Sequence, residues 1–338
     1  MKYRQFGKTE LQVSAIGFGC WEMGGTYGSI EESDVINAVH RGIDLGINCF
    51  DTAEDYGKGR SEEFLAKALG NRRKEIILVT KFGIGYEQGR DGGCSMVHTA
   101  IEGSLKRLNT DYVDVYLVHW PDRDTSFDET MAALEEIVQQ GKARYVGLSN
   151  FTPNEIQRCM AARRVDVLQY GYNLFDRRMA KWIFPYAREH NIGVMIYGSL
   201  AYGLLAGVFT EDTAFGNNDW RRRGGGNFSL RLFAPGVFKR NIQAVNEIKT
   251  IAERIGRKLP QLALNWVLSN PAVSTALVGA RNIAEVEENM GAMDWNLGEE
   301  IRYEIDRIFA KYEIDVAPNK WVEGNLDIDI ERQMREAS

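Results

Sequence analysis

Short apolar runs alternate with helical patterns along almost the whole chain. The apolar runs predict strands at residues 14–19, 46–51, 76–81, 113–119, 143–149, 165–169, 193–197 and 273–279. The spacing of apolar residues between them predicts helices at 33–45, 61–69, 96–108, 127–140, 153–162, 180–190, 240–255, 260–268 and 283–290. Such alternation requires a parallel sheet. Eight βα units favour a closed (β/α)8 barrel, the TIM barrel, over an open doubly wound sheet.

Three segments lie outside this repeat. Tyr3–Phe6 and Gln12–Val13 flank Gly7 and Lys8, which predicts an N-terminal β-hairpin that caps the bottom of the barrel. A Gly- and Arg-rich loop covers residues 208–236, and a C-terminal extension covers residues 312–338. Because composition shows no break, we expect one α/β domain over residues 1–338. Ser33 and Thr152 are the predicted caps of their helices.

Charge and cysteine content limit the classes of partner and the cellular location that can be expected. The net charge is −6 and the pI about 5.5, so nucleic acid and anionic membranes are not expected partners. No apolar run approaches the roughly 20 residues of a membrane span, and the N-terminus lacks a signal-type apolar stretch. The four cysteines form no C-x-x-C pair and are expected to be reduced. These features predict a cytoplasmic location.

Polar residues end three neighbouring strands. Asp51, Lys81 and His119 each follow an apolar run, and Tyr56 lies in the loop just after Asp51. Because the carboxyl ends of parallel strands share one edge, we expect these four side chains to form one site. Lys81 needs a counter-charge in such a place, and Asp51 is the natural partner. By themselves these two residues fit a structural ion pair equally well.

Tyr56 shifts the balance towards catalysis. An ammonium beside a phenol is expected to lower its pKa from about 10, which makes the phenol usable as an acid or a base. His119 is one of four histidines, and it alone ends a strand. A single His and a single Asp are too few for a metal hydrolase, so no metal site is predicted. Phosphate-loop, nucleophile-elbow and Rossmann glycine motifs are absent.

The motifs around these residues resemble those of the aldo-keto reductase family over about residues 3–309. The matching stretches are 51–57 with Ser61 and Glu62, 111–122, 141–151 and 197–207, in the style of the bacterial general-stress and inositol-locus reductases. The resemblance implies a barrel that binds NADPH across its mouth and transfers hydride reversibly to an aldehyde or ketone. It also implies that Tyr56 is the general acid, that Lys81, held by Asp51, lowers its pKa, and that His119 positions the carbonyl.

The same resemblance implies a set of cofactor contacts. The residues expected to contact the nicotinamide are Ser149, Asn150, Gln169 and Tyr197. Those expected to contact the pyrophosphate are Ser199, Leu200, Gly203, Leu205 and Gly207. Those expected to contact the adenosine end are Gly279, Arg281, Glu285, Glu288 and Asn289. Arg281 suits a 2′-phosphate, which favours NADPH, with NADH as the alternative. Two positions depart from the pattern: Val208 replaces a basic residue, and Glu285 replaces Gln. Residues 221–223, all Arg, could supply the missing charge or form a solvated loop.

The substrate pocket is expected to include Trp21, Tyr86 and Trp120. Besides carbonyl reduction, two other functions remain open. One is a nucleotide-binding regulatory subunit with little turnover, and the other is a Schiff-base aldolase that uses Lys81. The resemblance implies a small carbonyl substrate, with sugars and reactive dicarbonyls both compatible, but the sequence predicts neither the identity of the substrate nor the oligomeric state.

Overall fold

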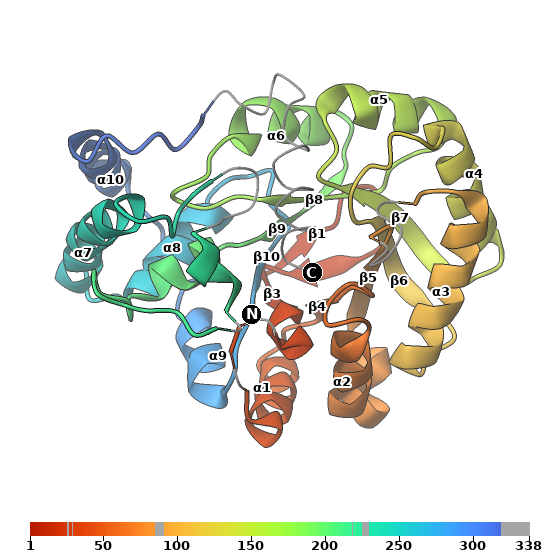
Figure 1. Cartoon of the computed structure of the whole chain (residues 1–338), viewed down its shortest axis with the longest axis horizontal. Coiled ribbons are helices and arrows are strands. Elements are labelled where there is room, and N and C mark those ends of the chain that lie inside the picture. The colour runs from red at the N-terminus through yellow and green to blue at the C-terminus, as the bar shows by residue number, and fades with distance from the viewer. Residues whose placement is uncertain (26, 29, 85–90, 218, 225–229, 319–338) are drawn as a thin grey trace.

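Eight parallel strands close into a barrel in this computed structural model, which describes residues 1–318 except 26, 29, 85–90, 218 and 225–229 (Figure 1). The strands follow one another around the barrel in chain order, and the last one, β10, closes it by pairing with both β9 and β3. The predicted (β/α)8 barrel is therefore confirmed. The strands are β3 (Ile16–Gly19), β4 (Cys49–Asp51), β5 (Ile77–Phe82), β6 (Val113–Val118), β7 (Ala143–Ser149), β8 (Val167–Gly171), β9 (Gly193–Tyr197) and β10 (Thr275–Val278).

An outer ring of helices covers the barrel (Figure 1). Nine of the described helices match the predicted ones to within three residues at each end; the tenth, α10, lies outside the predicted set. It packs against α7 and buries Ile305, Ile308 and Phe309, which recur at helical spacing in the sequence. The helices are α1 (Glu32–Asp44), α2 (Arg60–Leu69), α3 (Cys94–Leu108), α4 (Phe127–Gln139), α5 (Pro153–Ala162), α6 (Met179–Glu189), α7 (Val237–Arg254), α8 (Leu259–Leu268), α9 (Ile283–Met290) and α10 (Glu299–Lys311).

The two predicted helix caps have different outcomes. Thr152 caps α5, since its hydroxyl accepts the Glu155 N–H at 3.4 Å and the Glu155 carboxylate accepts the Thr152 N–H at 2.7 Å. The Ser33 cap is wrong, because α1 begins at Glu32 and Ser33 already lies inside its first turn. Acidic side chains at Glu32 and Asp34 instead favour that end of the helix through its dipole.

The N-terminal hairpin closes one end of the barrel, as predicted. Its strands β1 (Tyr3–Gln5) and β2 (Gln12–Ser14) are antiparallel. Phe6, Leu11 and Val13 are buried in one cluster with residues of the strands, among them Val79 and Val115. At the tip of the hairpin, Gly7 has φ +61°, and a Cβ there would lie 2.3 Å from the Gly193 nitrogen. The polar site residues must therefore lie at the other end of the barrel.

Two further features bear on the composition-based expectations. The four cysteines are free thiols; Cys94 is half-buried, and the other three are buried. Within the described ranges, no helix combines the length and the apolar character that crossing a bilayer requires.

Candidate active site

Lys81 is the centre of the site. Its side chain is 0% exposed, and its ammonium donates to Asp51 Oδ2 at 2.7 Å, to the Thr52 carbonyl at 2.7 Å and to Tyr56 Oη at 3.1 Å. The strands β4 and β5 are neighbours, which places the two charges side by side at the barrel rim. Three acceptors satisfy the three donors of the ammonium, so the buried charge is both paired and fully hydrogen-bonded. The predicted Asp51–Lys81–Tyr56 chain thus exists as a set of contacts.

The pKa of Tyr56 moves opposite to the sequence-based expectation. Burial raises it well above its ordinary range, and the Asp51 carboxylate adds to the rise. Lys81 does not reverse this, because Asp51 neutralises its charge at 2.7 Å and the pair presents little net charge to the phenol. Since an ammonium can only donate, Tyr56 Oη is the acceptor in their hydrogen bond, and its own O–H stays a donor. Tyr56 is therefore held as a protonated phenol.

His119 follows β6 and lies beside Tyr56. The two rings meet edge to face, with centroids 5.6 Å apart. The backbone carbonyl of His119 accepts the Asn150 amide at 2.9 Å, and Asn150 Oδ1 accepts the Tyr197 hydroxyl at 2.9 Å. Asn150 adopts a left-handed backbone, with φ 72°, at the end of β7. His119 is thus fixed from the neighbouring strands, and all four predicted catalytic residues lie together.

Gln169, which the sequence assigned only to the nicotinamide end of the cofactor, also binds Asp51. Its amide donates to Asp51 Oδ1 at 2.7 Å, across the barrel from β8 to β4. Its backbone carbonyl accepts a hydrogen bond from the Ser149 hydroxyl at 3.1 Å. Gln169 therefore orients the carboxylate that pairs with Lys81, a role that a separation of 118 residues hides in the sequence.

An aromatic wall extends from Tyr56. Trp21 stacks on Tyr56 with centroids 6.0 Å apart and on Trp220 at 5.6 Å. The rings of Tyr27 and Trp21 meet edge to face with centroids 4.9 Å apart, and those of Tyr202 and Trp220 do so at 5.3 Å. Trp21 lies beside the catalytic candidates, whereas the other members were not predicted; Tyr27 comes from the first loop, Trp220 from the 208–236 insertion, and Tyr202 from the 3₁₀ helix η3 (Ala201–Ala206) that follows β9. An isolated bridge between Tyr27 and Asp219 joins these two segments.

Arg221 lies over the glycine-rich stretch that follows β9. In the 3₁₀ helix η4 (Trp220–Arg223), Arg221 pairs with Asp219 at 2.5 Å and donates to the Tyr202 carbonyl at 3.1 Å. A Cβ on Gly203 would lie 2.9 Å from the Arg221 guanidinium. Arg221 is therefore an ordered cation beside residues 203–207, and the solvated-loop interpretation is wrong for it. Val208 is 71% exposed, and Gly225 and Gly226 lie outside the described residues.

Arg281 and Glu285 form an ion pair near the start of α9. The guanidinium lies 2.9 Å from Glu285 Oε1, and the Arg281 N–H donates to Oε2 at 2.9 Å. Glu285, which stands where the family pattern has Gln, thus pairs with Arg281, the residue predicted to bind a 2′-phosphate. The other predicted residues of this end include Glu288, which pairs with Lys258, and the buried Asn289.

Glu22 is an acidic residue of the mouth that the sequence reasoning did not single out. Its carboxylate lies directly against Gly279, where a Cβ would be 2.2 Å from Glu22 Oε1. Burial raises the pKa of Glu22 to about 7, and Glu285 adds to the rise, while Arg281 and Arg221 oppose it. Glu22 therefore lies beside Gly279, the residue that follows β10, within the electrostatic reach of Arg221 and Arg281.

The Glu22→Gln variant is expected to stabilise the protein at pH 8 by about 1–3 kcal/mol relative to wild type. The folded pKa of about 7 exceeds the ordinary 4.5, so the folded state holds the proton more tightly. Ionisation then costs stability as pH rises from about 4.5 to 7, and the advantage of Gln should vanish below that window. Denaturant unfolding of both proteins from pH 4.5 to 8.5 measures this difference in the free energy of unfolding. Glu54, whose pKa is also about 7, affects both proteins equally.

The roles of two predicted pocket residues stay predictions. Trp120 is buried within the main hydrophobic cluster, so its part in a substrate pocket stays a prediction. Tyr86 lies outside the described residues. Of the predicted pyrophosphate stretch, Leu205 and Ser199 are buried, Leu200 is half-buried, and Gly203 and Gly207 have positive φ of 93° and 76°.

The chain is similar to known proteins over most of its length. A family model described as Aldo/keto reductase family matches residues 15–310. The chain is 35% identical to the aldo-keto reductase YhdN of Bacillus subtilis, over 91% of this chain and 93% of that one. It is also 35% identical to a probable voltage-gated potassium channel subunit beta of Arabidopsis thaliana, over 87% and 92%.

Solved structures extend the likeness. A glycerol dehydrogenase from Gluconobacter oxydans superposes with a TM-score of 0.82 at 30% identity, over 94% of this chain and 98% of that one. An aldo/keto reductase from Klebsiella pneumoniae, solved in complex with NADP and acetate, superposes with a TM-score of 0.71 at 30% identity, over 93% and 95%.

Proposed function

The chain belongs to the Aldo/keto reductase family, and on that premise we propose that it reduces aldehydes and ketones to alcohols with NADPH. The oxidoreductase class expected from the sequence is confirmed at the level of the family. The observation that carries the proposal is the buried Lys81 ammonium, 2.7 Å from Asp51 and 3.1 Å from Tyr56. A structural ion pair alone would not need a phenol as third acceptor beside an imidazole ring.

The four polar residues divide the proton chemistry among them. When bound, NADPH supplies the hydride that the carbonyl carbon receives. Tyr56 donates its phenolic proton to the carbonyl oxygen. Lys81 then stabilises the phenolate by its hydrogen bond to Oη, and Asp51, oriented by Gln169, holds the Lys81 side chain in place. His119, edge to face with Tyr56, orients the carbonyl oxygen towards the phenol.

The mouth fits a dinucleotide phosphate cofactor. Gly203 and Gly207 expose backbone without side chains, and Arg221 brings a cation beside Gly203. Arg281 provides a second, half-exposed cation for a phosphate. We assign Ser149, Asn150, Gln169 and Tyr197 to the nicotinamide end, where Asn150 also holds the His119 loop. Arg221 takes the role of the basic residue that Val208 replaces.

The test is NADPH consumption by the purified full-length protein with a panel of aldehydes, ketones and aldoses. We expect turnover with at least one class, saturable in both substrates. NADPH binding without turnover across the panel would favour a regulatory subunit, the alternative that the similarity to the Arabidopsis channel subunit raises. Borohydride trapping should leave Lys81 unlabelled, because its ammonium is buried and bound to Asp51. Labelling would support an aldolase.

The Glu285→Gln variant is expected to strengthen the preference for NADPH over NADH by about tenfold, measured as the ratio of the two kcat/KM values. Glu285 now neutralises Arg281 at 2.9 Å, and its charge repels a 2′-phosphate; Gln removes the charge but keeps the size. The control is Glu287→Gln, which removes a carboxylate of the same helix that pairs with Arg41 instead. An unchanged ratio in the Glu285 variant would place the 2′-phosphate away from Arg281.

A further inference from the structure

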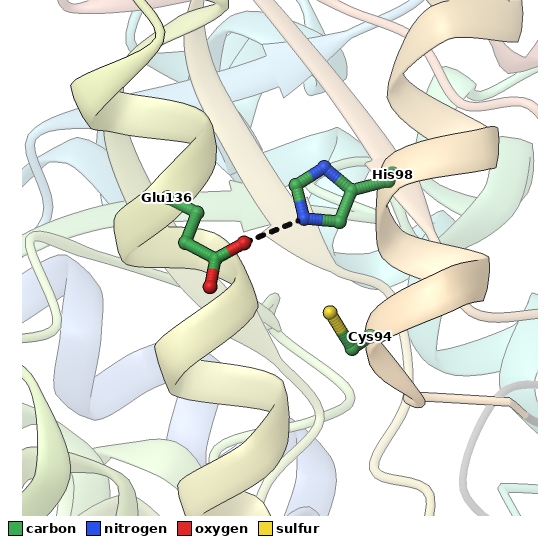
Figure 2. Close-up of side chains that lie close together, drawn as sticks. All are labelled: Cys94, His98 and Glu136. Atoms are coloured by element: carbon green, nitrogen blue, oxygen red, sulfur yellow. Dashed lines mark hydrogen bonds and ion pairs between the residues drawn. The ribbon is translucent and has the colours of Figure 1, made fainter.

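Three potential metal ligands from two helices meet on the outer face of the barrel. Cys94 and His98 lie one helical turn apart on α3, and Glu136 lies on the neighbouring α4. One thiol, one imidazole and one carboxylate oxygen all lie within 4.8 Å of one another. Figure 2 shows the three side chains pointing into the space between the two helices. We propose that this cluster binds a divalent transition metal of the zinc class.

The distances suit a small tetrahedral ion. Zinc bonds of about 2.0–2.3 Å place neighbouring ligand atoms roughly 3.5 Å apart. His98 Nε2 and Glu136 Oε2 already lie 3.0 Å apart, and all three ligand atoms lie within 4.8 Å of one another. Cys94 and His98, as an i, i+4 pair, face the same side of α3 without distortion of the helix. The cluster therefore needs little rearrangement to accept the ion.

The ligand types select the metal. A thiolate, an imidazole and a carboxylate are ligands of zinc, whereas calcium and magnesium take oxygen ligands only. A thiolate and the Glu136 carboxylate together carry two negative charges, which a divalent ion neutralises. Glu129, seven residues before Glu136 on α4, already accepts the Cys94 N–H at 3.1 Å. It adds negative charge, and water or this carboxylate completes the fourth position.

Exposure distinguishes this cluster from the rest of the chain's thiols and from an ordinary ion pair. The side chains of His98 and Glu136 are 28% and 56% exposed, so an ion has access from solvent. Cys20, Cys49 and Cys159 are buried and cannot compete for it. An exposed His–Glu pair alone contributes little to stability. The metal would instead tie the start of α3 to α4, and this proposal is independent of the reductase chemistry.

The expectation of no metal site, drawn from the sequence, concerned catalytic chemistry at the strand ends. The proposed site lies on other elements, and the separation of 38 positions between His98 and Glu136 conceals it in the sequence. Only the side-by-side packing of α3 and α4 brings the ligands together (Figure 1).

The test uses tag-free, reduced, full-length protein stripped with a chelator and titrated with Zn²⁺ or Co²⁺ alone. We expect one equivalent of Zn²⁺ to compete with a chromophoric chelator and to raise the thermal unfolding midpoint. Bound Co²⁺ should show thiolate-to-metal charge-transfer absorption. Loss of an outer partner of a metal ligand lowers affinity by about 10–100-fold, so Cys94→Ser, His98→Gln and Glu136→Gln should each lower it at least as much.

The matched control is Glu135→Gln, which removes the adjacent α4 carboxylate that pairs with Arg163 and should leave metal affinity unchanged. All four variants should keep wild-type NADPH turnover, since none touches the barrel mouth. Absence of stoichiometric binding, or binding that survives Cys94→Ser without loss of the charge-transfer band, would overturn the proposal. Neither result bears on the reductase assignment.

Discussion

The Tyr56→Phe variant is expected to slow hydride transfer by about 10²–10⁴-fold, while the Kd for NADPH stays within about twofold. Phe keeps the ring that packs against Trp21 and His119 but removes the hydroxyl proton that lies beside Lys81. Burial holds the pKa of the phenol well above its ordinary range, so Tyr56 is protonated and ready to donate at neutral pH. Reduction should therefore not weaken between pH 6 and 8 through ionisation of this group.

Single-turnover oxidation of NADPH is the appropriate measurement, because release of a product limits kcat in many enzymes. Tyr27→Phe is the matched control: it removes a second phenol of the mouth, whose ring also contacts Trp21, and should change the rate by less than about threefold. A Tyr56→Phe protein that reduces carbonyls at the wild-type rate would exclude Tyr56 as the proton donor. Tight NADPH binding in the variant would show that the mouth is intact.

Breaking the Asp51–Lys81 pair is expected to give the largest loss of stability. Lys81→Met leaves a buried carboxylate unpaired, and Asp51→Asn leaves a buried ammonium unpaired, so each should lower the free energy of unfolding by about 3–5 kcal/mol. The double variant leaves no charge and should cost less than the sum, with a coupling of about 1–3 kcal/mol. Denaturant unfolding of the four proteins measures this cycle. Additive losses would mean that the charges do not stabilise one another.

The same variants separate stability from catalysis. Lys81→Met also removes the donor to Tyr56 Oη, which should slow hydride transfer by about 10–100-fold even in the folded fraction. Asp114→Asn is the control, because Asp114 is a buried carboxylate that pairs with Arg73 at 3.0 Å away from Lys81. It should lower stability and leave the rate of the folded protein unchanged. An equal loss of rate in both would mean that instability, not chemistry, explains the effect.

The agreement between sequence and structure is best where the signal is local. Alternating strand and helix patterns located all eight barrel strands, and strand-end positions placed Asp51, Lys81 and His119 in one site. Thr152 was predicted correctly as a cap, and the structure adds Glu155, within one helical turn, as its reciprocal partner. Helix α10 was missed although Ile305, Ile308 and Phe309 recur at helical spacing, as the apolar residues of the predicted helices do. Ser33 was misread as a cap because its residue type alone does not define where a helix begins.

Properties that depend on burial or on distant contacts were decided by the tertiary structure. The direction of the Tyr56 pKa is one, because Asp51 neutralises Lys81 and burial then dominates. The Gln169–Asp51 hydrogen bond, Arg221 over Gly203, and the meeting of Cys94, His98 and Glu136 are others. By itself the sequence determined the barrel, the family and the residue types at its mouth, because periodicity and motifs are short-range. Which charges neutralise one another, and which side chains meet, depended on packing between elements that are far apart in the chain.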